Sequence, residues 1–218
     1  MNIAIVGATG NVGRKILEVL EKKKIPIKNL FLLASKKSSG KELFFNGKNI
    51  KVENLENFDF SKADITFFSA GGNIAAALAQ TCISSSLQRP NKLVLLSPWL
   101  DLSVQSKSND KNYSEFSPFD KEDTISFSED YIGKIDRNDS RVSPIYGSFE
   151  DFPETHIQAS KVEFLFDDTV ECIQKLNDAN VEHSVHFEEK ALHGWHLVPD
   201  FLPEASRSMM KVVEFLKR

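Results

Sequence analysis

The chain has 218 residues, of which 41% are hydrophobic and 27% are charged, and its formal net charge at pH 7 is −4. This composition is ordinary for a globular protein with one large α/β domain or two small ones, and it does not favour nucleic-acid binding. Two cysteines are too few for a disulfide framework, and no apolar run reaches the roughly 18 residues needed to span a membrane. Because Met1 leads directly into a strand-like run, no signal peptide is expected, and the expected compartment is a reducing cytoplasm.

The N-terminus predicts a dinucleotide-binding turn. An apolar, β-rich run at Asn2 to Val6 is followed by Gly7-Ala8-Thr9-Gly10-Asn11-Val12-Gly13, and Arg14 to Lys24 then has the apolar spacing of a helix. Strand, glycine turn and helix in this order form the context that such a turn requires. The glycines let the backbone approach a pyrophosphate, and the helix N-terminus presents N–H groups to it. A glycine-rich turn without a ligand is the alternative.

The second expected strand, Leu30 to Ala34, ends in a basic loop, Ser35-Lys36-Lys37-Ser38-Ser39-Gly40-Lys41. A NAD-preferring protein usually places Asp or Glu at this position to hold the ribose 2′-hydroxyl. Serine followed by two lysines could instead hold a 2′-phosphate, which favours NADP. A solvated basic turn is the alternative. A hairpin at Phe44 to Glu53, with Asn46-Gly47 as its turn, and a strand at Ile65 to Phe68 complete a mononucleotide-binding half.

These segments resemble the N-terminal part of aspartate-semialdehyde dehydrogenase. The resemblance rests on Gly-Ala-Thr-Gly-Asn-Val-Gly at 7–13, Leu-Ala-Ser-Lys-Lys-Ser-Ser-Gly-Lys at 33–41 and Phe-Phe-Ser-Ala-Gly-Gly at 67–72. It implies that the three segments meet the pyrophosphate, the 2′-phosphate and the nicotinamide end of NADP, in that order. The cofactor-binding residues that it implies are Gly7, Thr9, Gly10, Asn11, Val12, Gly13, Ser35, Lys37, Ser38, Ser69, Ala70 and Gly71. The family's catalytic domain, with its Asn-Cys nucleophile segment and later His, has no counterpart in this sequence.

The remainder of the chain predicts alternating helices and strands. Helices are expected at 74–84, 169–177 and 203–217, strands at 92–96, 156–160 and 182–188, and surface loop with short helices at 103–130. Strands that alternate with helices imply a parallel sheet covered on both faces.

Residues 69–218 resemble the C-terminal half of an α/β-hydrolase of the hormone-sensitive-lipase family. The resemblance rests on Ser-Ala-Gly-Gly-Asn at 69–73, Lys-Leu-Val-Leu-Leu-Ser-Pro-Trp-Leu-Asp-Leu at 92–102, Val-Ser-Pro-Ile-Tyr-Gly at 142–147 and Leu-His-Gly-Trp-His at 192–196. It implies that Ser69 is the nucleophile on a strand-to-helix elbow, that His193 is its general base, and that the substrate is a small ester.

The sequence departs from this second family at three places. Phe67 stands where the elbow pattern G-x-S-x-G has its first glycine, and the sequence has no His-Gly-Gly oxyanion motif. Counting back from Asp167-Asp168, which are expected to cap the helix near Thr169, places Val162 at the position of the triad acid. Glu163 beside it would point to the opposite side of an extended chain. At most a trace of esterase activity is therefore expected.

The other histidines predict no metal site. His183 and His186 face opposite sides of the expected strand, and His196 lies three residues from His193 without a suitably spaced carboxylate or cysteine. The apolar side of the C-terminal helix, with Met209, Val212, Val213 and Phe215, is either core or a dimer face, and core is favoured.

Both parent folds are doubly wound, mostly parallel α/β sheets in three α/β/α layers, so a join at Ser69 to Asn73 could keep one sheet of about seven strands. The expected organisation is a Rossmann-like half at 1–73 continued by an α/β-hydrolase-like half at 69–218, in one continuous domain. Three hypotheses follow: an NADP-binding chain without a complete dehydrogenase cycle, a weak serine carboxylester hydrolase using Ser69 and His193, or an engineered or accidental chimera without activity.

Overall fold

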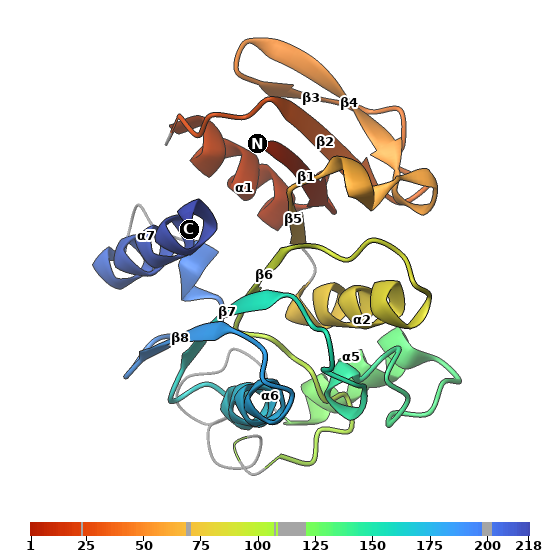
Figure 1. Cartoon of the computed structure of the whole chain (residues 1–218), viewed down its shortest axis with the longest axis vertical. Helices are drawn as coiled ribbons and strands as arrows, with labels where there is room; N and C mark the ends of the chain where they lie inside the picture. The colour runs from red at the N-terminus through yellow and green to blue at the C-terminus, as the bar shows by residue number, and fades with distance from the viewer. Residues whose placement is uncertain (23, 69–70, 107, 109–120, 198–201) are drawn as a thin grey trace. The chain divides into compact units, whose positions relative to one another are not determined.

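The computed structural model describes residues 1–22, 24–68, 71–106, 108, 121–197 and 202–218. The chain divides into two compact units. Unit 1 comprises Met1–Ala70 and Gln88–Leu93, and unit 2 comprises Gly71–Leu87 and Val94–Arg218. The strands form two sheets, of five and three strands, which Figure 1 shows with their helices. Whether the two units make one continuous domain, as the sequence suggests, stays a prediction.

Unit 1 is a half-Rossmann arrangement. Its elements are β1 (Asn2–Val6), α1 (Asn11–Lys22), β2 (Asn29–Ala34), β3 (Glu42–Phe45), β4 (Lys48–Asn54) and β5 (Ile65–Phe68), with short 3₁₀ helices at Leu55–Asn57 and Phe60–Lys62. The strand order is β3-β4-β2-β1-β5. The sheet is parallel except for the β3–β4 hairpin, and β1 pairs with both β2 and β5, with Val6 opposite Leu33 and Phe68.

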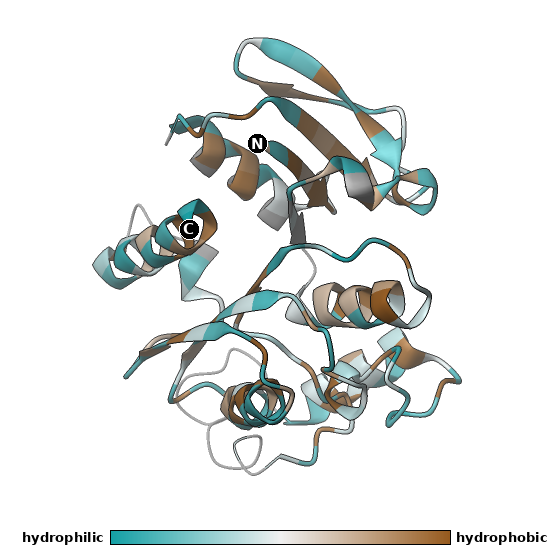
Figure 2. Cartoon of the chain, in the orientation of Figure 1, coloured by the Kyte–Doolittle hydropathy of each residue, from teal (hydrophilic) through white to brown (hydrophobic). Residues whose placement is uncertain are grey.

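The core of unit 1 lies on both faces of β1 and β2. Ile3 and Ile5 pack on one face with Leu32 and with Leu17 and Leu20 of α1. Their neighbours Ala4, Val6 and Leu33 pack on the other face with partly buried side chains from Phe31, Leu55, Phe58, Phe60 and Ala63. Figure 2 shows the mixture of hydrophobic and hydrophilic residues along α1 that one-sided packing requires. The near-continuous apolar sequence of these strands is explained by burial on both faces.

Unit 2 alternates strands and helices as predicted. Its elements are α2 (Gly71–Ser84), β6 (Lys92–Leu96), α5 (Lys121–Ile132), β7 (Glu154–Ser160), α6 (Phe166–Asp178), β8 (His183–Glu188) and α7 (Pro203–Lys217), with 3₁₀ helices at Pro144–Tyr146 and Trp195–Leu197. The sheet order is β6-β7-β8, and β7 pairs with β8 in parallel. Val212 and Phe215 of α7 are buried, so this side of the helix belongs to the core, as favoured from the sequence.

Candidate functional site

The turn after β1 is fixed by backbone hydrogen bonds to the neighbouring strand. Gly7 has φ +75°, a left-handed conformation that favours glycine. Its N–H and that of Ala8 donate to Leu33 O of β2, at 2.8 and 3.1 Å, and Gly10 N–H donates back to Gly7 O at 2.9 Å. The chain then enters α1 at Asn11, so a helix N-terminus stands directly after the carboxyl end of β1.

Gly13 allows α1 to pack closely against this turn. A Cβ atom at this position would lie 2.4 Å from Gly7 O and 2.6 Å from Ala8 Cα, closer than real Cβ atoms approach. A Cβ at Gly10 would lie 3.3 Å from Gly7 O, which is tight but tolerable. In dinucleotide-binding turns the last glycine serves this close packing of helix on strand. The residues present therefore fit a pyrophosphate at this turn.

The basic loop lies at the same sheet edge. It follows the carboxyl end of β2, and the N–H groups of Ser38 and Ser39 donate to Ser35 O at 2.8 and 3.1 Å, which folds it into a turn. Lys36 and Lys37 are exposed, so their ammonium groups are accessible to a charged ligand. Because β2 and β5 flank β1, the chain order reverses beside β1, and open α/β sheets bind ligands at such a switch point.

Of the third segment, Ser69 and Ala70 lie outside the described residues, and α2 begins at Gly71, earlier than the predicted start near Ile74. Gly71 has φ +78°. A Cβ at Gly72 would lie 2.6 Å from Pro98 Cβ, so the first turn of α2 packs directly on the loop after β6. Both glycines are therefore required by the local geometry of this helix start.

Glu163 and His193 form a hydrogen-bonded pair in unit 2. His193 Nδ1 lies 3.0 Å from Glu163 Oε2, and the side chain of Glu163 is 0% exposed while that of His193 is 30% exposed. Ser160 N–H donates to the other oxygen, Oε1, at 3.0 Å. If the carboxylate accepts this hydrogen bond, Nδ1 carries the proton and Nε2 is left without one in the neutral ring. Along the chain, Glu163 follows β7 and His193 follows β8, and these two strands lie side by side (Figure 1).

This pair corrects the expectation that the acid is missing. Glu163 was expected to point away from the histidine, on the assumption that the chain stays extended beyond β7. Instead β7 ends at Ser160 and residues 161–165 form turns, so the alternation of side chains along a strand no longer applies. The carboxylate therefore comes from the residue next to the position counted from the sequence.

Comparison with known proteins identifies the family of this fold. A family model described as the alpha/beta hydrolase fold matches residues 47–197. The chain belongs to the α/β-hydrolase fold family. A solved esterase of the bacterial hormone-sensitive lipase family is similar with a TM-score of 0.67 and 25% identity, over 74% of this chain and 54% of that chain. An esterase/lipase from an uncultured bacterium has a TM-score of 0.66 and 23% identity over the same shares of the two chains. The predicted three-layer, mostly parallel α/β class is confirmed.

Curated relatives of this α/β-hydrolase-fold chain belong to the other predicted family. Aspartate-semialdehyde dehydrogenase 2 of Vibrio cholerae is 53% identical over 78 residues, which are 36% of this chain and 23% of the relative. The enzyme of Rickettsia typhi is 38% identical over 120 residues, 51% of this chain and 36% of the relative. The chain thus spans about a quarter to a third of these relatives and about half of the esterases. The resemblance to two families is confirmed, and it is consistent with a chimera.

Asp167 and Asp168 of the hydrolase-fold part are not helix caps, contrary to the prediction. Asp168 Oδ2 accepts the N–H groups of Leu100 and Asp101 at 2.8 and 2.9 Å, and Asp167 Oδ2 accepts that of Ser108 at 2.7 Å. Burial raises the pKa of Asp168 to about 8. These carboxylates therefore hold the segment after β6, which lies far away in the sequence. The predicted capping would have involved only N–H groups of the adjacent helix.

The other titratable candidates of unit 2 are structural. Burial lowers the pKa of His156 to about 4 and that of His196 to about 3, and it raises the pKa of the Cys82 thiol. His156 stacks on Phe215 of α7. Within the ranges that the structure describes, no group of three or more His, Cys, Asp and Glu side chains could hold a metal ion, and no helix is long and apolar enough to cross a membrane.

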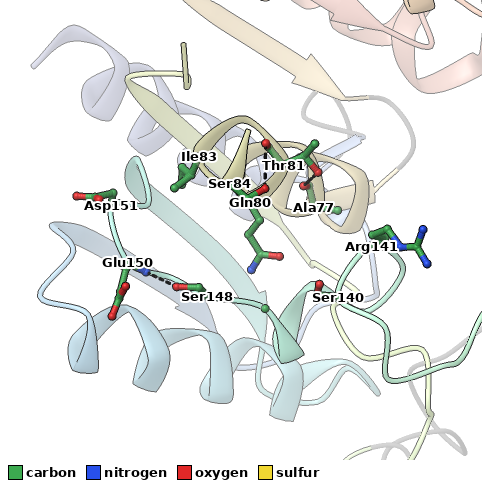
Figure 3. Close-up of a pocket in the computed structure, with 11 residues that line it drawn as sticks. Ala77, Gln80, Thr81, Ile83, Ser84, Ser140, Arg141, Ser148, Glu150 and Asp151 are labelled. Atoms are coloured by element: carbon green, nitrogen blue, oxygen red, sulfur yellow. Dashed lines mark hydrogen bonds between the residues drawn. The ribbon is translucent and has the colours of Figure 1, made fainter. Parts of the chain in front are cut away.

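A hollow of about 370 Å³ lies beside the C-terminal half of α2 (Figure 3). Two of its polar side chains already have partners: Gln80 Nε2 donates to Pro144 O at 2.8 Å, and Arg141 is bonded to Asp139. Glu150 N–H donates to Ser148 Oγ. Neither Glu163 nor His193 lines it, and its side chains do not converge on a common point, so we assign it no function.

Proposed function

We propose that unit 1 binds NADP. The observation that carries the proposal is the close packing of Gly13 against the turn at Gly7. This packing places the N-terminus of α1 at the carboxyl end of β1. A helix N-terminus in this position favours a pyrophosphate through its N–H groups and its dipole. The confirmed similarity to aspartate-semialdehyde dehydrogenases supports the same proposal.

Three segments would hold the cofactor. Gly7 to Gly13 would meet the pyrophosphate, and Ser35, Lys37 and Ser38 the 2′-phosphate, where an ammonium group and two hydroxyls give charge-assisted hydrogen bonds. The resemblance assigns Ser69, Ala70 and Gly71 to the nicotinamide end. Bound NADP supplies hydride chemistry. This sequence lacks the dehydrogenase nucleophile segment, so the proposal is binding without a complete redox cycle.

Thermal unfolding with and without saturating NADP tests this function, with NAD in parallel. A ligand at 100 times its dissociation constant stabilises the folded state by about 2.7 kcal/mol, which raises the melting temperature by several degrees. We expect this rise with NADP and a smaller one with NAD at equal concentration. A cooperative melt that neither nucleotide changes would contradict the proposal.

A second candidate function is slow ester hydrolysis, which the Glu163–His193 pair favours. Ser69 would attack the carbonyl carbon, Nε2 of His193 would take its proton, and Glu163 would hold the imidazole ring through Nδ1. The substrate would be a small activated ester. The hormone-sensitive-lipase-family esterases among the similar structures support this assignment.

Turnover of p-nitrophenyl acetate tests the second function, with Ser69→Ala and His193→Gln as variants. We expect a slow rate that both substitutions reduce to the background of the assay. A rate that Ser69→Ala leaves unchanged would show that the hydrolysis comes from another group. If neither NADP binding nor Ser69-dependent turnover is found, the chain is a chimera without either parental activity, the third hypothesis.

A further inference from the structure

Ser160 connects the two loops that carry the Glu163–His193 pair. It is the last residue of β7 and is completely buried. Its N–H donates to Glu163 Oε1 at 3.0 Å, and its Oγ accepts the N–H of Ala191 at 3.0 Å. Ala191 precedes His193 by two residues on the loop after β8. One buried residue therefore holds the acid through its backbone and the histidine loop through its side chain.

Phe164 of the loop after β7 also contacts the His193 ring, with centroids 5.4 Å apart, but the other polar links between the described residues of these loops are weaker or more remote. Lys161 and Glu189 form an ion pair at 2.6 Å, but their side chains are 44% and 79% exposed, and such pairs contribute little. Lys161 N–H donates to Glu188 O at 2.9 Å, which extends the strand pairing but stops five residues before His193. The Ser160 hydroxyl thus makes a buried hydrogen bond to the backbone of the histidine loop, two residues before His193.

We propose that Ser160 is a positioning residue for the candidate catalytic pair. Its hydroxyl sets the path of the chain into His193, and its N–H turns the Glu163 carboxylate toward Nδ1. Without the hydroxyl, Ala191 N–H would be buried without this acceptor, and the loop would move to find another. The catalytic consequence rests on the proposed ester hydrolysis, whereas the structural arrangement does not depend on it.

A purely structural role for Ser160 would lower stability without changing the pair. The two roles are separated by the ¹⁵N chemical shifts of the imidazole nitrogens, which report whether Nδ1 or Nε2 carries the proton in the neutral ring. If Glu163 accepts from Nδ1, the neutral His193 ring is fixed as the Nδ1–H tautomer. A loop that has moved would leave a mixture of tautomers.

The variants are Ser160→Ala and, as a matched control, Thr155→Ala. Thr155 lies on the same strand, is also completely buried and donates its hydroxyl to Pro153 O at 2.7 Å, away from the pair. His193→Gln assigns the His193 ring signals. At pH 8 we expect the Nδ1–H tautomer in the parent chain and in Thr155→Ala, and a mixture in Ser160→Ala. We also expect kcat for p-nitrophenyl acetate to fall by roughly 10- to 100-fold in Ser160→Ala with KM little changed, as for a misplaced catalytic group.

A folded Ser160→Ala chain with the parent ring signals would overturn the proposal. If that variant does not fold, amide hydrogen exchange in the parent chain decides: Ala191 N–H should exchange much more slowly than Lys190 N–H, and equal rates would overturn it. A parent chain without Ser69-dependent turnover, whose ring signals still depend on Ser160, would refute the esterase function and leave the positioning role intact.

Discussion

Replacing Gly13 with alanine would test whether the packing of α1 forms the nucleotide turn. The added Cβ would lie 2.4 Å from Gly7 O and 2.6 Å from Ala8 Cα, and neither backbone atom can move without moving the turn. At an open helix position this substitution would stabilise the helix by roughly 0.5–1 kcal/mol. Overpacking of this kind costs about 1–3 kcal/mol, so we expect Gly13→Ala to destabilise unit 1 by roughly 1–2 kcal/mol.

The same displacement should remove nucleotide binding, since the N-terminus of α1 would no longer stand against the turn. Thermal unfolding measures both effects. The Gly13→Ala variant should melt several degrees lower and lose most of the roughly 2.7 kcal/mol that NADP at 100 times its dissociation constant would add. Gly10→Ala is the control for stability without nucleotide, because its Cβ would lie 3.3 Å from Gly7 O. A Gly13→Ala chain with the parent melting temperature and the parent response to NADP would refute this reasoning.

Three further predictions address the basic loop, the catalytic pair and a buried carboxylate. Lys37→Ala should weaken NADP binding by roughly tenfold, as loss of a charge-assisted hydrogen bond does, and leave NAD binding unchanged in fluorescence titrations. Glu163→Gln should lower the Ser69-dependent kcat by up to about 10⁴ because the tautomer of His193 is no longer fixed; an unchanged kcat would exclude Glu163 as the acid. Burial raises the pKa of Asp168 to about 8, far above the roughly 3.9 of an unfolded aspartate, so the folded state keeps a proton that the unfolded state has lost. Stability should therefore fall as pH rises toward 8, by at most about 1.4 kcal/mol per pH unit, and urea unfolding from pH 6.5 to 8 should show that Asp168→Asn removes this slope.

Unit 1 could be predicted well because its signals are local. Each signal, whether an apolar strand, a glycine turn or a hairpin turn, is contained in a few consecutive residues. Asn46 and Gly47 have φ of +46° and +77°, as a two-residue hairpin turn of Asn-Gly requires. The strand β1 has the predicted bounds, Asn2–Val6. Local backbone preferences therefore account for these elements of unit 1.

The direction of the Glu163 side chain was predicted wrongly because it depends on where β7 ends. The sequence does not mark the end of this strand, since Ser160, Lys161 and Val162 are all compatible with an extended chain. One signal was present: Glu163 is the only carboxylate between Ser160 and Phe166. Only the assumption of an extended chain excluded it.

The contacts of Asp167 and Asp168 could not be predicted from local sequence. Two acidic residues before a helix are typical of capping, and no local feature distinguishes that role from the observed one. Their partners, the N–H groups at Leu100, Asp101 and Ser108, lie 59 to 68 residues earlier in the chain. Backbone N–H groups far away in the sequence can bind such a carboxylate instead of the helix N-terminus, and only the tertiary structure shows which of them it binds.

The Glu163–His193 pair raises the rate of ester hydrolysis that we expect from this chain. A missing acid would cost about 10⁴ in rate, and this loss would not apply if Glu163 is the acid, as we propose. The absence of a His-Gly-Gly motif from the sequence remains, and each missing oxyanion donor costs about 10²–10³. Such losses do not simply add, because the groups act together. The expected activity is therefore slow but dependent on Ser69, and since orientation of the base is already provided, supplying oxyanion donors should raise kcat more than any further change at the pair.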